Sequence, residues 1–78
     1  MSIDSKKILT YQKEFGKQLK KIRLSKKMSQ LDLAASCDLE KTSISRIENG
    51  RTNTTLKTMI IISEALNVNI YELFDFEI

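Results

Sequence analysis

The chain has no histidine, one cysteine and two glycines among its 78 residues. Without histidine it lacks the side chain whose ordinary pKa best suits acid–base catalysis and metal binding near neutral pH. It also has no glycine-rich loop of the kind that cradles phosphate groups. The single cysteine, Cys37, excludes an internal disulfide, and we interpret it as a small buried apolar side chain rather than a nucleophile. These absences argue against an enzyme, and the sequence indicates no metal, cofactor or small-molecule site.

Long apolar runs are absent as well. The longest covers residues 59–62, far short of the roughly 18 residues that a membrane-spanning helix needs. The first residues are polar and charged, so no secretory signal is recognisable. Together with the lone cysteine, these features predict a cytoplasmic protein with no membrane partner. A chain of this size forms one domain with a modest core, to which dimerisation would add buried surface.

The net charge of +3 is unevenly distributed along the chain. All thirteen Lys and Arg residues lie at or before Lys57, together with six acidic residues, so this part carries +7. The rest of the chain contains four acidic residues and no base, which gives −4. One part of the molecule is therefore suited to face a polyanion while the other stays away from it. Lysine-rich helices are also ordinary solvated surfaces, so charge alone leaves both interpretations open.

The hydropathy pattern predicts helices throughout. Proline is absent, and no window alternates between apolar and polar residues over a strand length. The first helix is expected from about Tyr11 to Ser25, with an earlier start left open. Its apolar stripe, spaced three or four residues apart, consists of Ile8, Tyr11, Phe15, Leu19 and Ile22. Gly16 costs about 1 kcal/mol relative to alanine inside a helix, which suggests that a neighbouring element approaches closely there.

A second helix is expected to open at Ser29, because its hydroxyl and the carboxylate of Asp32 form the pattern of a capping box. The helical pattern lapses at residues 36–38, and Leu39 is expected to plug the turn that follows. The apolar face of this helix is expected to be narrow and to consist of Leu31, Ala34 and Ala35.

A third, short helix is expected from residue 40 or 41 to residue 48, with Gly50 as a left-handed cap after it. Two short helices joined by a tight turn, here within residues 30–49, are the plan of a helix-turn-helix. Ile44 and Ile47 face inward. The outer face is left with polar residues that suit hydrogen bonding to base edges, namely Lys41, Thr42, Ser43, Ser45 and Arg46. An exposed helix is polar in any case, so this pattern alone also fits a solvated face.

A fourth helix, capped by Thr54 or Thr55, is expected to reach Leu66, and a fifth, short helix is expected over residues 69–74. We therefore expect an all-α fold of five helices. The chain divides into an N-terminal extension with the start of the first helix, a domain, and a C-terminal tail, which are residues 1–14, 15–74 and 75–78.

Five segments share one register with a known pattern: residues 19–23 (LKKIR), 28–34 (MSQLDLA), 42–50 (TSISRIENG), 65–68 (ALNV) and 71–74 (YELF). In this register the chain resembles the Cro/repressor-type, or Xre-like, helix-turn-helix family of phage repressors, antitoxins and restriction-modification controller proteins. The resemblance covers residues 15–74. It implies a lambda-repressor-like five-helix fold and sequence-specific binding to double-stranded DNA.

The resemblance also implies roles for single residues. Ser29 and Gln30 are implied to bind DNA. Gln30 is implied to contact phosphate and to brace the first residues of the recognition helix. Asn49 and Arg51 are implied to hold the sugar-phosphate backbone after that helix. The side chains implied to face the major groove are Lys41, Thr42, Ser43 and Arg46.

Arg23 and Glu48 match a pair that forms an internal salt bridge in this family, and such a pair serves orientation more than net stability. Two kinds of position depart from the family pattern. Glu40 stands where the family usually has a Ser, Thr or Asp cap, and its charge suits the helix dipole but not a nearby phosphate. Non-glycine residues also stand where the family often has glycine, namely Lys27, Asp38 and Asn67.

The fourth helix suggests a partner surface. Its core side is expected at Leu56, Met59, Ile60, Ser63 and Leu66, with Ile62 at the edge. Ile61 and Ala65 then point away from the core, and an apolar residue there needs cover. We predict a homodimer through the last two helices and the tail, with Ile61, Ala65, Tyr71, Phe74, Phe76 and Ile78 as interface residues. The alternative is that Phe74 belongs to the core and the last residues are disordered.

The sequence therefore predicts a transcriptional regulator that binds a pseudo-palindromic operator as a homodimer. Its two recognition helices would lie about 34 Å apart. The alternative is a protein-interaction module that keeps the fold without binding DNA. The polar outer face of the third helix and the +7 charge up to Lys57 favour DNA. The sequence does not separate a controller protein from a phage-type repressor or an antitoxin.

Overall fold

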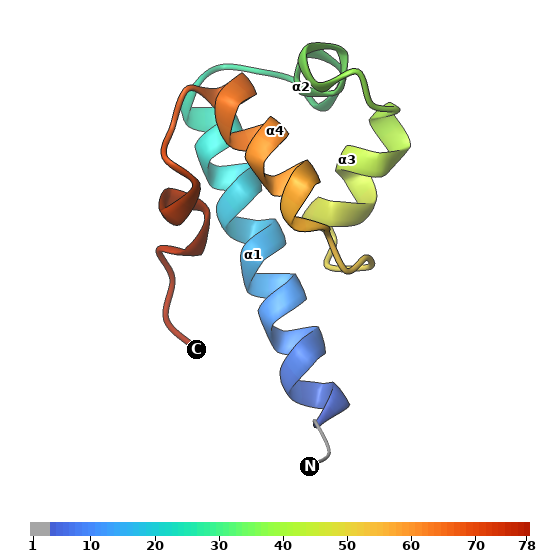
Figure 1. The fold of residues 1–78 in the computed structure, drawn as a ribbon, viewed down its shortest axis with the longest axis vertical. Helices are drawn as coiled ribbons and strands as arrows, with labels where there is room; N and C mark the ends of the chain where they lie inside the picture. Colours follow the sequence, from blue (N-terminus) through green and yellow to red (C-terminus); the bar gives the residue numbers. More distant parts are fainter. Residues whose placement is uncertain (1–3) are drawn as a thin grey trace.

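The structure, a computed structural model, describes residues 4–78 (Figure 1). Within them the chain forms four α-helices and a 3₁₀ helix, with no strand. The elements are α1 (Ser5–Ser25), α2 (Gln30–Cys37), α3 (Lys41–Glu48), α4 (Leu56–Leu66) and η1 (Ile70–Phe74). The all-α class is confirmed. The expected fifth helix is a 3₁₀ turn of five residues, too short to develop α-helical hydrogen bonding.

Local capping determines where the helices begin. Asp4 caps α1, since its carboxylate accepts from the Lys6 N–H at 2.9 Å, and the helix starts six residues before Tyr11. The capping box of α2 is present: Ser29 Oγ accepts from the Asp32 N–H, and Asp32 accepts from the Ser29 N–H, both at 2.9 Å. Thr55 caps α4 at 3.2 Å.

Within residues 4–78, four residues take left-handed backbone conformations where helices end or the chain turns. Gly50 has φ +70°, and the three departures from the family's glycine pattern have φ between 55° and 58°. Asp38 and Asn67 accept this region more readily than other non-glycine residues do. Lys27 has no such local compensation and carries backbone strain.

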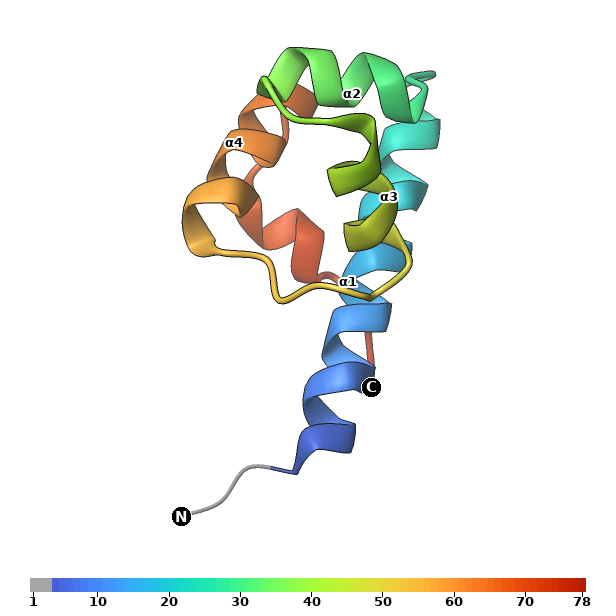
Figure 2. The ribbon, with the colours of Figure 1, turned by 90° about the vertical axis from the view of Figure 1, so that its right-hand side faces the viewer.

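The core lies between α1 on one side and α2, α3 and α4 on the other (Figures 1 and 2). Its buried apolar side chains are Phe15, Leu19, Leu33, Ala34, Cys37, Ile44, Ile47, Ile62, Leu66 and Leu73. Leu39 packs against them, as expected for the turn between α2 and α3. Ile8 and Tyr11 are exposed, because the first turns of α1 project beyond the other helices. No helix between residues 4 and 78 is long and apolar enough to span a membrane.

The predicted apolar face of α2 is wrong in part. Leu31 is 63% exposed and Ala35 is also exposed, whereas Leu33 and Cys37 are buried beside Ala34. In a helix of eight residues with so many apolar side chains, periodicity does not select one face. The packing of α2 against both α3 and α4 selects it instead.

The predicted faces of α4 also need correction. Ile62, expected at the edge, is fully buried, while Leu56 and Ile60, expected in the core, are 65% and 46% exposed. Ile61 and Ala65 are half-buried and pack against the core, so the expectation that they point away from it is wrong. Residues 59–62 are all apolar, so hydropathy could not define which side of α4 faces inward.

Helix α1 approaches the backbone of α3 closely at Gly16. A Cβ atom at this position would lie 2.5 Å from the carbonyl oxygen of Glu48 and would also clash with that of Ile47. Backbone atoms cannot yield as a flexible side chain does. The expected close approach at Gly16 is therefore confirmed, and it joins the middle of α1 to the end of α3.

Candidate nucleic-acid interface

Helix α3 presents its polar face to solvent. Ile44 and Ile47 are buried, and they fix the rotation of the helix about its axis. Lys41, Thr42 and Arg46 are exposed, and Ser43 is half-buried beside them. The four side chains that the resemblance assigns to the major groove therefore lie on the solvent-facing side of one helix. Glu40 precedes this helix and makes no side-chain cap hydrogen bond, so its exposed carboxylate stands at the helix start.

A buried ion pair fixes the end of α3 to α1. Arg23 Nε donates to Glu48 Oε2 at 2.6 Å, and Nη2 donates to Oε1 at 3.0 Å. Arg23 Nη1 also donates to the Met28 carbonyl at 2.7 Å, which ties in the turn before α2. The two ionised residues are 5% and 7% exposed. The hydrogen bond that Arg23 donates to the Glu48 carboxylate raises the pKa of Arg23. The salt bridge that the resemblance implies is present in the structure.

Gln30 completes this network. Its Nε2 donates to Glu48 Oε1 at 3.0 Å, so one side chain from α1 and one from α2 meet at the Glu48 carboxylate of α3. The resemblance implied that Gln30 braces the first residues of α3. In the structure Gln30 bonds instead to Glu48, the last residue of α3, because Glu48 lies beside the start of α2. A primary amide carries two N–H groups, so one remains for an anion.

The other residues implied to contact the DNA backbone lie near helix ends. Ser29 is exposed, and its hydroxyl oxygen accepts from Asp32 while its hydrogen stays free to donate. The Ser29 N–H donates a hydrogen bond to the Asp32 carboxylate, which lowers the pKa of Asp32. Asn49 Nδ2 donates to the Ser45 carbonyl at 2.9 Å, and Arg51 is exposed in the loop that follows.

The loop after α3 is anchored on α1 by contacts that the sequence did not reveal. Gln12 Nε2 donates to the Gly50 carbonyl at 3.0 Å. The backbone and Cγ of Lys13 lie so close to Gly50 that a Cβ there would come within 2.7 Å of the Lys13 Cγ. Gln12 is half-buried and Lys13 is exposed, and neither residue carried a sequence pattern in this lysine-rich helix that could have predicted these contacts.

The charges are separated in space as well as in sequence. The acidic C-terminal part, with η1 and residues 75–78, lies on the side of α1 away from α3 (Figures 1 and 2). Gln18 holds it there, because its Nε2 donates to the Glu72 carbonyl at 2.9 Å. The three acidic residues of this segment, Glu72, Asp75 and Glu77, therefore lie away from α3.

Two observations bear on metal binding and on thiol chemistry. Within residues 4–78 no three potential metal ligands cluster together. Cys37 is buried, and desolvation raises the pKa of its thiol, so it stays neutral and inaccessible.

Comparison with known proteins identifies the family. The Helix-turn-helix family matches residues 19–73. Control protein C.BamHI from Bacillus amyloliquefaciens is 49% identical over 63 residues, which cover 80% of this chain and 78% of that protein. Control protein C.MunI from Mycoplasma sp is 44% identical over 61 residues, covering 77% and 82%. The crystal structure of the restriction-modification controller protein C.AhdI from Aeromonas hydrophila has a TM-score of 0.78 and 31% identity, covering 80% of this chain and 94% of that one. The chain therefore belongs to the helix-turn-helix family, whose members are DNA-binding transcriptional regulators and not enzymes.

Proposed function

We propose that this protein is a controller of a restriction-modification system, which acts in the cytoplasm as a homodimer on a pseudo-palindromic operator. The similarity to two control proteins over most of their length supports the controller role over a phage repressor or an antitoxin. The observation that carries DNA binding is the rigid placement of α3. Its polar face is exposed while its opposite face is buried and its end is locked by Arg23 and Gln30.

The proposed contacts divide into two groups. Lys41, Thr42, Ser43 and Arg46 read base edges, because Arg and Lys donate to guanine, and Ser and Thr bond to several bases. The residues proposed to bind phosphates and hold the protein in register are Ser29, Gln30, Asn49 and Arg51. Phosphate contacts carry no sequence information directly, so the two groups differ in a measurable way.

In-vitro selection from random duplexes, followed by footprinting of the winners, tests the proposal. On the selected duplex, Arg46→Ala should cost about 1–3 kcal/mol and relax preference at one base position. Arg51→Ala should weaken binding to every sequence and lower the salt dependence by about one phosphate's share. Equal effects of both variants on selected and random DNA would refute this division of roles.

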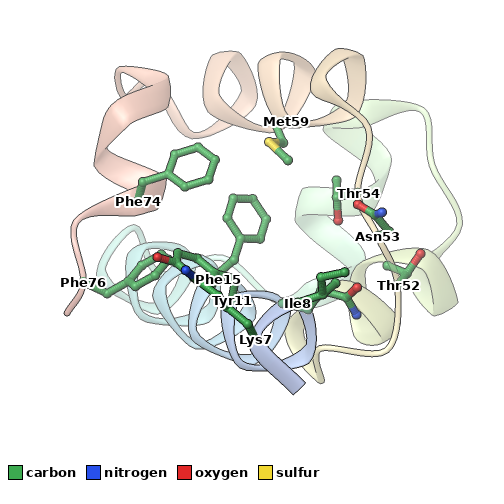
Figure 3. Close-up of a pocket in the computed structure, with 11 residues that line it drawn as sticks. Lys7, Ile8, Tyr11, Phe15, Thr52, Asn53, Thr54, Met59, Phe74 and Phe76 are labelled. Atoms are coloured by element: carbon green, nitrogen blue, oxygen red, sulfur yellow. The ribbon is translucent and has the colours of Figure 1, made fainter. Parts of the chain in front are cut away.

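An exposed apolar patch supports the homodimer. Leu56 and Ile60 are exposed one turn apart on α4, and Tyr71 and Phe74 are exposed on η1. Met59, Phe15 and Phe74 also line an apolar groove of about 420 Å³ between α1, α4 and the C-terminal segment (Figure 3). A second copy of the chain is the proposed occupant. This surface adjoins the acidic C-terminal segment, so a two-fold dimer there leaves both α3 helices free for DNA.

The interface residues therefore differ in part from those that the hydropathy pattern indicated. Ile61 and Ala65 share their side of α4 with Thr58, which borders α3, so they are poorly placed for a partner. Tyr71 and Phe74 remain in the proposal. Phe76 is half-buried, its ring packs 6.4 Å from that of Tyr11, and it lines the same groove.

Sedimentation at micromolar concentration tests the interface. Ile60→Asp should convert the dimer to a folded monomer, because it places a charge in the patch without touching the core. Leu24→Asp is the matched control, since Leu24 is similarly exposed at the far end of α1 and should leave the dimer intact. A monomeric parent, or a dimer that tolerates Ile60→Asp, would refute the proposed interface.

A protein-interaction module without DNA binding is the second candidate. The same exposed patch favours it, because an apolar surface also suits a different protein partner. Failure of every selected duplex to bind above the level of random DNA, together with a stable monomer in solution, would support this candidate.

A further inference from the structure

Helix α1 has a polar face beside the end of α3 to which no role has been assigned. Gly16 marks the side of α1 that touches the α3 backbone. At 3.6 residues per turn, Lys13 lies about 60° around the helix from Gly16, whereas Lys21 lies about 140° around it. Lys13 is therefore on the flank that borders α3, and Lys21 is on the far side.

Lys13 is placed by direct contact. Its backbone and Cγ pack against Gly50, the left-handed residue between Asn49 and Arg51. The neighbouring Gln12 holds the same Gly50 carbonyl at 3.0 Å. The start of the Lys13 side chain is thus held beside the two residues proposed to bind phosphate, while the residue as a whole is exposed.

The ammonium group of Lys13 is available to bind an anion. Within residues 4–78 the ion pairs are Lys17 with Glu14 and Arg23 with Glu48, so no carboxylate neutralises Lys13. A lysine stem is long enough to pack its methylenes against the protein while the ammonium group reaches past them. Gly50 has no side chain that would block the ammonium group of Lys13.

We propose that Lys13 is a further phosphate-binding residue, so that α1 contributes to the DNA interface together with the loop after α3. The inference rests on the proposed DNA binding. The ammonium of Lys13, the amide of Asn49 and the guanidinium of Arg51 are all groups that can donate to a backbone phosphate of duplex DNA. This contact is independent of base sequence, and it uses a residue outside the helix-turn-helix motif.

Fluorescence anisotropy on Lys13→Gln tests the proposal. Glutamine keeps the Cβ and Cγ that pack on Gly50 and removes only the charge. The probes are the duplex recovered by in-vitro selection and a random-sequence duplex of equal length, each titrated from low to high salt. The slope of log K against log salt should fall by about 0.9 for each Lys13 that contacts DNA, and both duplexes should lose affinity by the same factor.

Two further variants make the result decisive. Lys13→Arg keeps the charge and should restore the slope. Lys21→Gln removes the same charge from the same helix on the far side and should leave the slope nearly unchanged. If the slope of log K against log salt fell equally in Lys13→Gln and in Lys21→Gln, the inference would be overturned while DNA binding itself would stand. Failure of the parent protein to bind either duplex would instead refute the proposed function.

Discussion

Replacing Glu48 with alanine removes the carboxylate on which α1, α2 and α3 converge. Arg23 loses its bonds at 2.6 Å and 3.0 Å, and Gln30 loses its bond at 3.0 Å. Arg23 is 5% exposed, so its charge stays buried with the Met28 carbonyl as its remaining partner. Removing one member of a buried pair typically costs about 3–5 kcal/mol. A domain of this size has roughly 4–12 kcal/mol of total stability, so Glu48→Ala should remove a large fraction of it.

Urea denaturation followed by circular dichroism measures this cost. The midpoint should fall while the slope of unfolding free energy against urea stays unchanged, because the surface exposed on unfolding is nearly the same. Glu14→Ala breaks the exposed pair with Lys17, which is 3.2 Å long, and should cost less than about 1 kcal/mol. The double variant Arg23→Met/Glu48→Leu should recover much of the loss, since apolar residues can replace a buried ion pair. A Glu48→Ala protein as stable as Glu14→Ala would refute the reasoning.

Three further predictions concern backbone and burial. Gly16→Ala should destabilise the protein by about 1–3 kcal/mol despite the better helix propensity of alanine, because the new Cβ meets backbone carbonyls. Thermal unfolding should show a lower Tm, and an unchanged Tm would contradict this prediction. Lys27→Gly should stabilise the fold by about 0.5–1 kcal/mol in urea, because it relieves a left-handed lysine, and a lower midpoint would count against strain at this turn. Burial raises the pKa of the Cys37 thiol, so the unfolded chain ionises first and stability should fall as pH rises above about 8.5. The urea midpoint between pH 8 and 10 should fall less in Cys37→Ala, and equal losses in both proteins would refute this account.

Several features were predictable because they depend on residues close in sequence. The capping box of α2 needs only Ser29 and Asp32, three residues apart. The left-handed turn at Asp38 follows from the side chain and the lapse in helical pattern. The buried side of α3 follows from Ile44 and Ile47, whose spacing leaves one apolar stripe on an otherwise polar helix.

The rotations of α2 and α4 were not predictable from the sequence. Both helices carry more apolar residues than one face can hold, so several rotations bury similar amounts of apolar surface. Contacts with distant elements select among them, and this is why Leu56 and Ile60 are exposed while Ile62 is buried. The proposed dimer surface changed for the same reason.

The sequence by itself determined the helical class, the order of the helices, most of their caps and the polar face of α3. These depend on spacing and on bonds within a few residues, which the linear chain already specifies. Only the tertiary structure decided which sides of α2 and α4 face inward, that Gln30 bonds to the end of α3, and that Lys13 lies beside Gly50. The bond between Gln30 and Glu48 joins residues 18 positions apart, and the contact of Lys13 with Gly50 joins residues still further apart. All of these contacts form only when the helices pack around one core.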